Sequence, residues 1–457
     1  MNDARIAQIE ALLRSEGLCS AADLAMALRV SQPTVSRLIA SMGPRILQIG
    51  RARATRYALT RDIARAGSRW PLYRLDDNGI AQRMGILTAL HGDRFHFEAE
   101  LALPAFLHGQ FQNGLFPGLP WFLDIQRPQG FLGRSFARRV AADMHVPPDL
   151  VHWKPDDVLL ALLRHGEDEA GDLVLGEHCL QLAQMAMLSP QGVIEADRRL
   201  ERYPRLAEEA LQGDIVGSSA GGEQPKFTAT LSDGDDYRTV IVKFSDRIDT
   251  ASGRRWADLL RAETVAGRIL QAHGISTARS TAFEAGGRIF MESTRFDRTA
   301  VLGRRGLIHL AAIDAAFYGH GDPRWQTFAD ELERDGWIDT GDADALRVIG
   351  WFGDLIANND MHAGNIGLHL SDQRPLRLAP VYDMLPMRFR PSANGEVVAR
   401  EYEVRLPLPE QRSDWRRAAV MALDFWQAIL DDPDISGDFQ HIAEKAKQTL
   451  GNAARRF

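Results

Sequence analysis

The strongest constraint on the fold is a polar segment that follows an apolar run. Residues 351–357 are mostly apolar and predict a buried helix, and the polar segment Asn358–Asn365 comes directly after it. Asp360 lies in this segment, Asn365 follows five residues later, and Asp383 stands a short distance further on. In phosphoryl-transfer sites an Asp orients or deprotonates a hydroxyl nucleophile, while an Asn and a second Asp hold Mg²⁺ against nucleotide phosphates. The spacing indicates this chemistry, although an ordinary Asn- and Asp-rich turn would explain the segment taken alone.

A glycine-rich segment upstream supplies the next part of such a site. Residues 217–226 include small residues that let backbone N–H groups wrap phosphate oxygens. Two predicted strands with a turn between them follow, and Lys243 stands near the end of the second strand. In kinases a lysine so placed reaches the nucleotide phosphates and pairs with a glutamate of the next helix, a role that Glu263 can fill. Each motif is weak alone, but their order along the chain favours a kinase-like fold.

The remaining pattern divides this part of the chain into two lobes. Residues 288–298 change from a predicted strand to a charged linker, which in a kinase would be the hinge between the lobes. Beyond residue 305 the apolar residues recur with mostly helical spacing. We therefore expect an α+β protein with an N-terminal lobe over residues 76–293, which includes a β-rich subdomain, and an α-rich C-terminal lobe over residues 294–457.

The first 62 residues differ in character from the rest. Residues 1–60 contain eight arginines and four acidic residues, a net charge of +4, which leaves −11 for the remainder of a chain whose total is −7. Apolar spacing and capping signals predict helix, helix, tight turn and helix, then two strands, which is the plan of a winged helix-turn-helix over residues 1–62. The residues placed to contact double-stranded DNA are Gln32, Thr34, Ser36 and Arg37 on the third helix and Arg51, Arg53 and Arg56 in the hairpin. A three-helix protein-interaction module is the alternative.

The segment after this head carries little chemical information. Residues 63–75 are polar, contain glycine and proline, and predict a linker, while residues 76–150 predict short strands with loops. The two cysteines, Cys19 and Cys179, have no metal-type spacing and fit a reducing compartment. The N-terminus lacks the apolar core of a signal peptide, and no run of about 18 apolar residues indicates a membrane span. We therefore expect a cytoplasmic protein that has no membrane partner.

At these motifs the sequence resembles the HipA family of bacterial Ser/Thr kinases, toxins of toxin–antitoxin systems. The resemblance covers residues 75–457 and rests on the Ser219–Lys226 loop, Ile241–Lys243, Arg295–Arg298, the Asp360–Asn365 loop and Tyr382–Asp383. The Asp360–Asn365 loop also looks like that of phosphatidylinositol kinases, because its histidine follows the aspartate instead of preceding it. HipA proteins usually borrow a DNA-binding domain from a separate antitoxin, whereas this chain resembles a stand-alone branch in which a winged helix is fused to the kinase.

The resemblance implies a role for each matched residue. Asp360 is implied as the catalytic base, Asn365 and Asp383 as Mg²⁺ ligands, and Lys243 as the phosphate-binding lysine. ATP is the implied cofactor, and the residues implied to contact it are Ser219, Gly221, Gly222, Gln224, Lys226, Lys243, Glu263, Thr294, Phe296, His362, Asn365, Tyr382 and Asp383. Ser219 aligns with a serine that such kinases autophosphorylate, which ejects the phosphate loop and switches the enzyme off. Its neighbour Ser218 is the alternative.

The leading hypothesis is an ATP- and Mg²⁺-dependent Ser/Thr protein kinase that inhibits growth as a toxin, controls itself by autophosphorylation, and binds DNA through its head. The substrate that the resemblance implies is a protein, such as an aminoacyl-tRNA synthetase. A homodimer would fit recognition of a palindromic DNA site. The alternatives are a transcriptional regulator whose kinase-like body senses nucleotide or a partner without transferring phosphate, and a lipid or small-molecule kinase.

Overall fold

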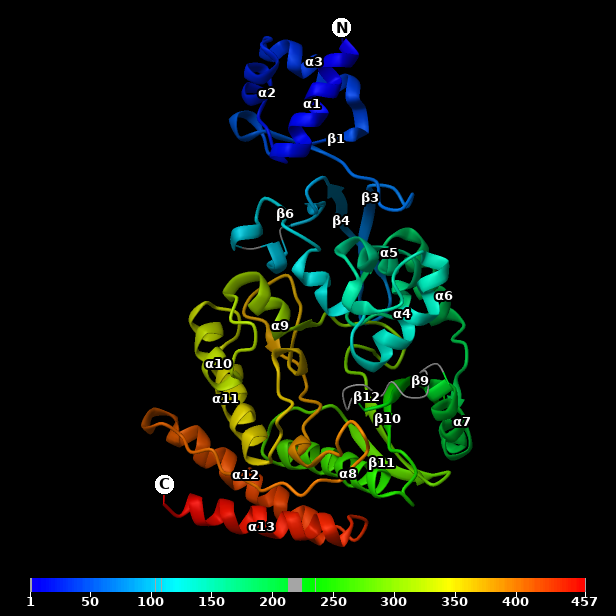
Figure 1. Cartoon of the computed structure of the whole chain (residues 1–457), viewed down its shortest axis with the longest axis vertical. Helices are drawn as coiled ribbons and strands as arrows, with labels where there is room; N and C mark the ends of the chain where they lie inside the picture. The colour runs from blue at the N-terminus through cyan, green and yellow to red at the C-terminus, as the bar shows by residue number, and fades with distance from the viewer. Residues whose placement is uncertain (1, 103, 108, 213–223, 235, 457) are drawn as a thin grey trace.

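The computed structural model describes residues 2–102, 104–107, 109–212, 224–234 and 236–456. The chain combines helices with mostly antiparallel sheets, so the expected α+β class is confirmed. The head formed by residues 2–60 lies at one end of the molecule, and helices α12 (Arg412–Asp431) and α13 (Gly437–Ala454) lie at the other end (Figure 1). The molecule is elongated along the line that joins these ends.

The head has the elements that the sequence predicts. Within residues 2–60 they are α1 (Asn2–Glu16), α2 (Ala21–Leu28), α3 (Gln32–Met42), β1 (Ile46–Ile49) and β2 (Arg56–Leu59). Ser20 caps α2 in a capping box with Asp23, which fixes where this helix begins. The apolar faces of the helices meet in a small core that includes Ile9, Leu24 and Val35. The assignment of this unit as a winged helix stays a prediction.

Apolar and ionic contacts attach the head to the next unit. Leu47 of β1 and Ala58 of β2 pack against Leu90. The Arg61 guanidinium pairs with the Asp156 carboxylate, with 3.0 Å between Arg61 Nη2 and Asp156 Oδ1. Because Arg61 follows the hairpin directly, the head is held against the body at the point where the chain leaves it.

A sheet with accompanying helices forms the middle unit. Its strands run in the order β6 (Leu115–Phe116), β5 (Arg94–Ala99), β4 (Ala81–Leu90), β3 (Arg69–Leu75) and β7 (Leu173–Leu175), and its helices are α4 (Gly130–Met144), α5 (Pro155–His165) and α6 (Glu177–Leu188). Two expectations need correction. Residues 69–75 of the predicted linker form the inner strand β3, and the predicted β-rich segment over 76–150 also contains α4. Pro71 and a register shift after Leu72 break the usual strand signals, which explains why β3 is hidden in the sequence.

A second sheet carries the predicted nucleotide-binding segments. Its strands run in the order β11 (Ser280–Ala285), β12 (Arg288–Thr294), β10 (Asp236–Phe244), β9 (Lys226–Asp233) and β8 (Ile194–Glu195). Helix α7 (Arg199–Gln212) packs on one face and α8 (Ala251–Ala272) on the other. Val242 and Phe244 of β10 belong to the core on the α7 side, whereas Met291 of β12 packs with α8. Because side chains alternate along a strand, Lys243 points to the face that α8 covers.

Helices dominate the C-terminal lobe, as predicted. It contains β13 (Ile308–His309), β14 (Gly367–His369), β15 (Arg377–Leu378), α9 (Leu310–Ile313), α10 (Trp325–Arg334), α11 (Thr340–Leu355), α12 and α13. Trp351 of α11 and Trp415 and Trp426 of α12 are fully buried in its core. Helix α11 ends just before Ala357, which has a φ of +61°, so it delivers the segment Asn358–Asn365 at its C-terminal end. No helix among the described residues combines the length and apolar character needed to cross a bilayer.

Ion pairs and hydrogen bonds tie the segment between the lobes to the middle unit. Arg298 Nη1 and Arg295 Nη2 lie 2.8 and 2.9 Å from Asp297 Oδ2. Arg298 Nη2 lies 2.9 Å from Asp168 Oδ1, and the Gly171 N–H donates to Asp297 Oδ2 at 3.0 Å. Burial alone would raise the pKa of Asp297, but the two guanidiniums hold it well below its usual range. The predicted hinge is therefore fixed to a loop of the middle unit.

Candidate active site

Lys243 joins the second sheet to the helix that covers it. Its Nζ lies 2.8 Å from each carboxylate oxygen of Glu263 in α8. The same Nζ contacts Oδ1 of Asp383, which comes from the C-terminal lobe. Lys243 and Glu263 are buried, whereas the Asp383 side chain is 29% exposed. The predicted lysine, glutamate and second aspartate thus meet at one point between the lobes.

Burial and close charges set the ionisation of this trio. Burial alone would lower the pKa of Lys243, but the Asp383 and Glu263 carboxylates raise it above its ordinary value. Burial would raise the pKa of Asp383, yet Lys243 and the nearby Lys226 lower it. Burial is the largest influence on Glu263 and raises its pKa, against the opposing effect of Lys243. At neutral pH Lys243 and Asp383 are therefore charged, which is the state that binding of phosphate oxygens and a cation requires.

The backbone of Asp383 has a conformation that few residues adopt. Its φ is +59°, in the left-handed region that Asp tolerates better than most residues. Val381, two residues earlier, is held by backbone hydrogen bonds to the segment that precedes β11. Asn358 Nδ2 donates to the backbone oxygen of Asp383 at 3.2 Å. Unusual backbone positions of this kind gather at functional sites, and this turn directs the Asp383 carboxylate towards Lys243.

Hydrogen bonds hold the loop that carries Asp360. The side-chain oxygen of buried Asn358 accepts from the Asp360 backbone N–H at 3.2 Å. Asn365 Nδ2 donates to the Asp360 backbone oxygen at 3.0 Å, which fixes the orientation of the Asn365 amide. His362 Nδ1 accepts from the Gly364 N–H at 3.1 Å. The Asp360 side chain is exposed, as a group that receives a proton from an incoming hydroxyl must be.

Tyr382 packs beside this loop and meets a residue that sequence reasoning missed. Its hydroxyl donates to the Gly364 oxygen at 3.1 Å and lies 3.3 Å from His309 Nε2. Since the single hydroxyl proton goes to the carbonyl, His309 Nε2 carries the hydrogen in the second contact. Removal from water lowers the pKa of His309 to about 4, so this histidine is neutral at physiological pH. The Phe296 ring lies 5.8 Å from the Tyr382 ring, centroid to centroid.

The other predicted nucleotide contacts fall into two groups. Lys226 of β9 lies opposite Lys243 of β10 in the antiparallel register. The side-chain N–H of Gln224 donates a hydrogen bond to a backbone oxygen of β10. Thr294 pairs with Val240 at the end of β12. Four predicted residues lie outside the described residues, and their roles stay predictions: Ser218, Ser219, Gly221 and Gly222.

The donor set suits Mg²⁺ and nucleotide phosphates. Asp383 and Asn365 offer a carboxylate and an amide oxygen, and Mg²⁺ prefers oxygen ligands from one or two protein groups together with phosphates and water. Lys243 and Lys226 place positive charge beside Asp383. Over the described ranges, no group of three or more His, Cys, Asp or Glu side chains could hold a metal by itself. The residues present fit a metal that shares its ligands with a nucleotide.

The head presents its predicted DNA contacts at the surface. Thr34 is half-buried, and the exposed residues are Gln32, Ser36, Arg37, Arg51, Arg53 and Arg56. The Arg37 guanidinium lies along α3, where it donates to Thr34 Oγ1 at 3.3 Å. Both predicted groups therefore offer donors to solvent, and their contact with DNA stays a prediction.

Comparison with known proteins identifies the family. The HipA-like C-terminal domain matches residues 218–453, and the YjjJ-like toxin middle domain matches residues 66–184, which begin just before β3 and end within α6. The chain therefore belongs to the HipA-like family of kinase-fold toxins. Among its relatives is Toxin YjjJ of Escherichia coli (strain K12), which is 38% identical over 436 residues, 95% of this chain and 95% of that protein.

Two solved structures are similar at low sequence identity. HipA of Shewanella oneidensis MR-1, solved with HipB and operator DNA, is 16% identical, covers 84% of this chain and 97% of its own, and has a TM-score of 0.48. The Helicobacter pylori proinflammatory kinase CtkA is 14% identical, covers 52% of this chain and 93% of its own, and has a TM-score of 0.35. The expected family is confirmed by the sequence matches and not by these weaker likenesses.

Proposed function

We propose that the protein is an ATP- and Mg²⁺-dependent serine/threonine protein kinase. The observation that carries the proposal is the meeting of Lys243, Glu263 and Asp383 beside the loop of Asp360 and Asn365. Protein kinases need a lysine–glutamate pair and a metal-binding aspartate in place together. The contacts of the Lys243 ammonium with both carboxylates support the proposal.

The proposed roles follow from the chemistry of each group. Asp360 orients the substrate hydroxyl and accepts its proton as the phosphoryl group is transferred. Lys243, kept cationic by its two carboxylate neighbours, binds phosphate oxygens. Asn365 and Asp383 would hold Mg²⁺, whose charge offsets that of the phosphoryl group. Thr294 and Phe296 would border the adenine beside Tyr382.

The family supports a proposal for the biological role. A kinase-fold toxin would inhibit growth by phosphorylating a cellular polypeptide. The resemblance to HipA proteins favours a translation component, such as an aminoacyl-tRNA synthetase, and such a substrate would place the reaction in the cytoplasm. Growth inhibition by the wild-type chain that disappears in an Asp360→Asn variant would link the role to the chemistry.

Autophosphorylation is the regulatory step that we propose, on Ser219 or on its neighbour Ser218. Because transfer requires Asp360, we expect phosphate on one of these serines in the wild-type protein and none in Asp360→Asn. Phosphopeptide mapping by mass spectrometry of both purified proteins measures this. As a control, the wild-type protein is stripped by phosphatase and incubated again with ATP and Mg²⁺. Equal phosphate on both proteins would show labelling by another kinase and contradict the proposal.

We also propose that the head binds double-stranded DNA. Replacing both Arg37 and Arg51 by Ala is expected to weaken binding, because exposed guanidiniums displace the counterions that surround DNA phosphates. The slope of log K against log salt should fall by about 0.9 for each phosphate that the variant no longer neutralises. Fluorescence anisotropy of a short random-sequence duplex over a salt series measures both quantities.

A matched control separates DNA contact from general charge. Arg205→Ala removes an exposed arginine of α7, far along the chain from the head, and should leave the salt slope unchanged. An unchanged slope in the Arg37→Ala and Arg51→Ala variant would contradict DNA binding by these residues. Intact DNA binding by a wild-type protein that transfers no phosphate would favour the transcriptional regulator instead.

A further inference from the structure

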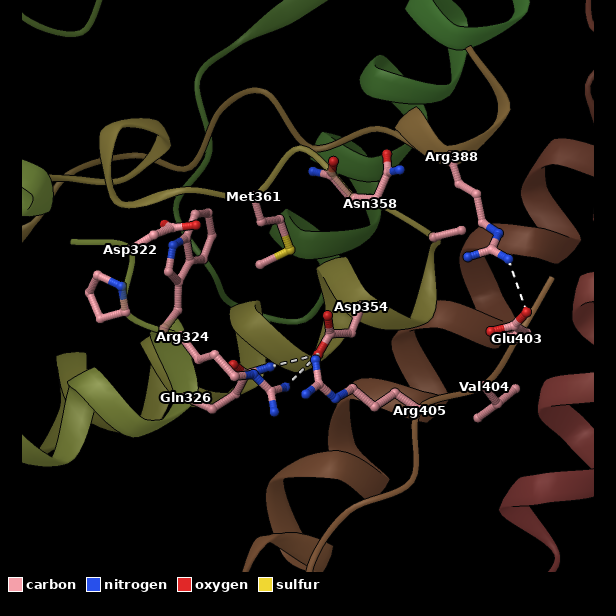
Figure 2. A pocket seen from close by; sticks show the side chains of 14 residues that line it. Asp322, Arg324, Gln326, Asp354, Asn358, Met361, Arg388, Glu403, Val404 and Arg405 are labelled. Carbon is pink, nitrogen blue, oxygen red and sulfur yellow. Dashed lines mark hydrogen bonds and ion pairs between the residues drawn. The ribbon is translucent and has the colours of Figure 1, made fainter. Parts of the chain in front are cut away.

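A pocket of about 520 Å³ lies beside the loop that carries Asp360 (Figure 2). Asn358, Asn359 and Met361, the neighbours of Asp360, form one wall. The rest of the lining includes the N-terminal end of α10, the C-terminal end of α11 and residues 403–405. Asp360 itself does not line the pocket. A substrate whose hydroxyl reaches Asp360 would therefore place a neighbouring residue, and not the acceptor, in this space.

Two guanidiniums in the pocket share one carboxylate. Arg324 Nη2 lies 2.9 Å from Asp354 Oδ2, and Gln326 Nε2 donates to the same oxygen at 3.0 Å. Arg405 Nη1 approaches this oxygen too, at 4.0 Å, and its side chain is 54% exposed (Figure 2). Asp354 is mostly buried, so it balances one of the two arginines. Arg405 is the cation that a bound anion would neutralise.

The N-terminal end of α10 borders the same space. Trp325 lines the pocket and is only 3% exposed, yet its indole Nε1 has no hydrogen-bond partner in the part of the chain that the structure describes. Trp325 is also the first residue of α10, a helix of ten residues. Arg324, at the N-cap, has only donor groups and cannot cap the free N–H groups of the first turn. The indole N–H is closed off from solvent, so the features that favour an anionic ligand here are the exposed Arg405 and the helix N-terminus without a side-chain cap.

The acidic residues of the pocket limit the kind of anion. Asp322 is exposed and lies on the opposite side of the pocket from Arg405 (Figure 2). Glu403 lines it as well and pairs with Arg388 at 3.1 Å. A nucleic-acid backbone, which carries a charge at every residue, would meet these carboxylates. A polypeptide with a single acidic side chain would not.

We propose that this pocket binds an acidic side chain of the polypeptide substrate, close in sequence to the serine or threonine that accepts phosphate. The inference rests on the proposed kinase function and adds a substrate class to it. Arg405 and the first turn of α10 would receive the carboxylate. Asp322, on the other side of the pocket, would repel a second acidic residue of the substrate.

The test uses the full-length protein and a set of synthetic peptides that contain one serine. In each peptide a single position near the serine is varied and carries Glu, Gln or Lys. Phosphate transfer from labelled ATP gives kcat/KM for each peptide, and fluorescence anisotropy gives its affinity without any transfer. At one position near the serine, we expect kcat/KM for the Glu peptide to exceed that for the Lys peptide about tenfold. This ratio corresponds to about 1.4 kcal/mol, the effect of a single charge pair. Arg405→Glu should reverse this preference, whereas Arg205→Glu on α7 should keep it.

The outcomes separate this inference from the proposed function. Self-labelling with ATP by a wild-type protein that treats Glu, Gln and Lys peptides alike would overturn the inference and leave the kinase standing. A Glu preference that survives Arg405→Glu would also overturn it. A wild-type protein that transfers no phosphate would contradict the proposed kinase function. The peptide affinities would then test the pocket, because Arg405→Glu should still reverse the preference for Glu over Lys. Displacement of the Glu peptide by a single-stranded oligonucleotide, lost in Arg405→Glu, would assign the pocket to nucleic acid and overturn the inference.

Discussion

Replacing Asp360 by Asn is expected to lower the rate of phosphate transfer about 10²–10⁴-fold, because a positioned general base contributes a factor of this size. The loop should keep its shape, since Asn358 and Asn365 bond to the backbone of Asp360 and not to its carboxylate. Single-turnover transfer from labelled ATP measures the rate, and nucleotide titration measures binding. The rate should fall while the affinity for ATP and the melting temperature stay close to those of the wild type.

The control is Asp197→Asn, which makes the same chemical change at an exposed position outside the site. It should transfer phosphate at the wild-type rate. A wild-type rate in Asp360→Asn would contradict the assigned role of this residue. Loss of ATP affinity or of melting temperature along with the rate would mean that Asp360 acts on the structure of the loop instead.

Replacing Lys243 by Met is expected to abolish transfer and also to destabilise the fold by about 3–5 kcal/mol, the cost of removing one partner from a buried ion pair. The change leaves the Glu263 and Asp383 carboxylates near each other without the ammonium that both contact. Thermal unfolding measures the loss. Lys445→Met, at an exposed position of α13, is the matched control and should melt like the wild type.

The destabilisation in Lys243→Met should depend on pH. Burial and the like charge of its neighbour would raise the folded-state pKa of one carboxyl above its unfolded value of about 4. A raised folded pKa means that the folded state binds the proton more tightly, so the variant gains stability as pH falls and loses it as pH rises through that pKa. The difference in melting temperature from the wild type should therefore be smaller at mildly acidic than at mildly alkaline pH.

A second substitution tests this explanation. Lys243→Met combined with Glu263→Gln removes one of the two like charges, and it should recover much of the stability without recovering transfer. A double variant as unstable as the single one would show that the loss comes from packing around Lys243 and not from the unpaired carboxylates. The two readouts together separate the structural role of the pair from its role in catalysis.

The sequence predicts the trio of Lys243, Glu263 and Asp383 because its members sit on elements with clear local signals. A strand end, the next helix and an Asp after an apolar run are each visible within a short window. Asn358 is visible as well, but only as one more polar residue of the loop, since its bond to the Asp383 backbone joins segments 25 residues apart. His309 gives no signal, because its role depends on a contact with Tyr382 across 73 residues.

The middle unit shows a different limit. Strand β3 contains Pro71 and a register shift, so neither composition nor alternation marks it, and only its neighbours β4 and β7 define it. The pocket beside Asp360 is also invisible in the sequence, because Arg324, Asp354 and Arg405 come from separate elements and meet only in the folded chain. Local periodicity predicts elements, whereas the surroundings of a site depend on contacts between distant parts of the chain.

The ion cluster between the lobes has a consequence for how such proteins can change over time. Arg295, Arg298 and Arg304 are buried, and they donate to Asp168 or to backbone oxygens of the loop 167–171. Recombination that replaced the middle unit with an unrelated one, while keeping the kinase-like lobes, would leave these arginines without those acceptors. The two units should therefore pass from one protein to another together, as a single module, while the head, attached near Arg61, is the part that can be exchanged.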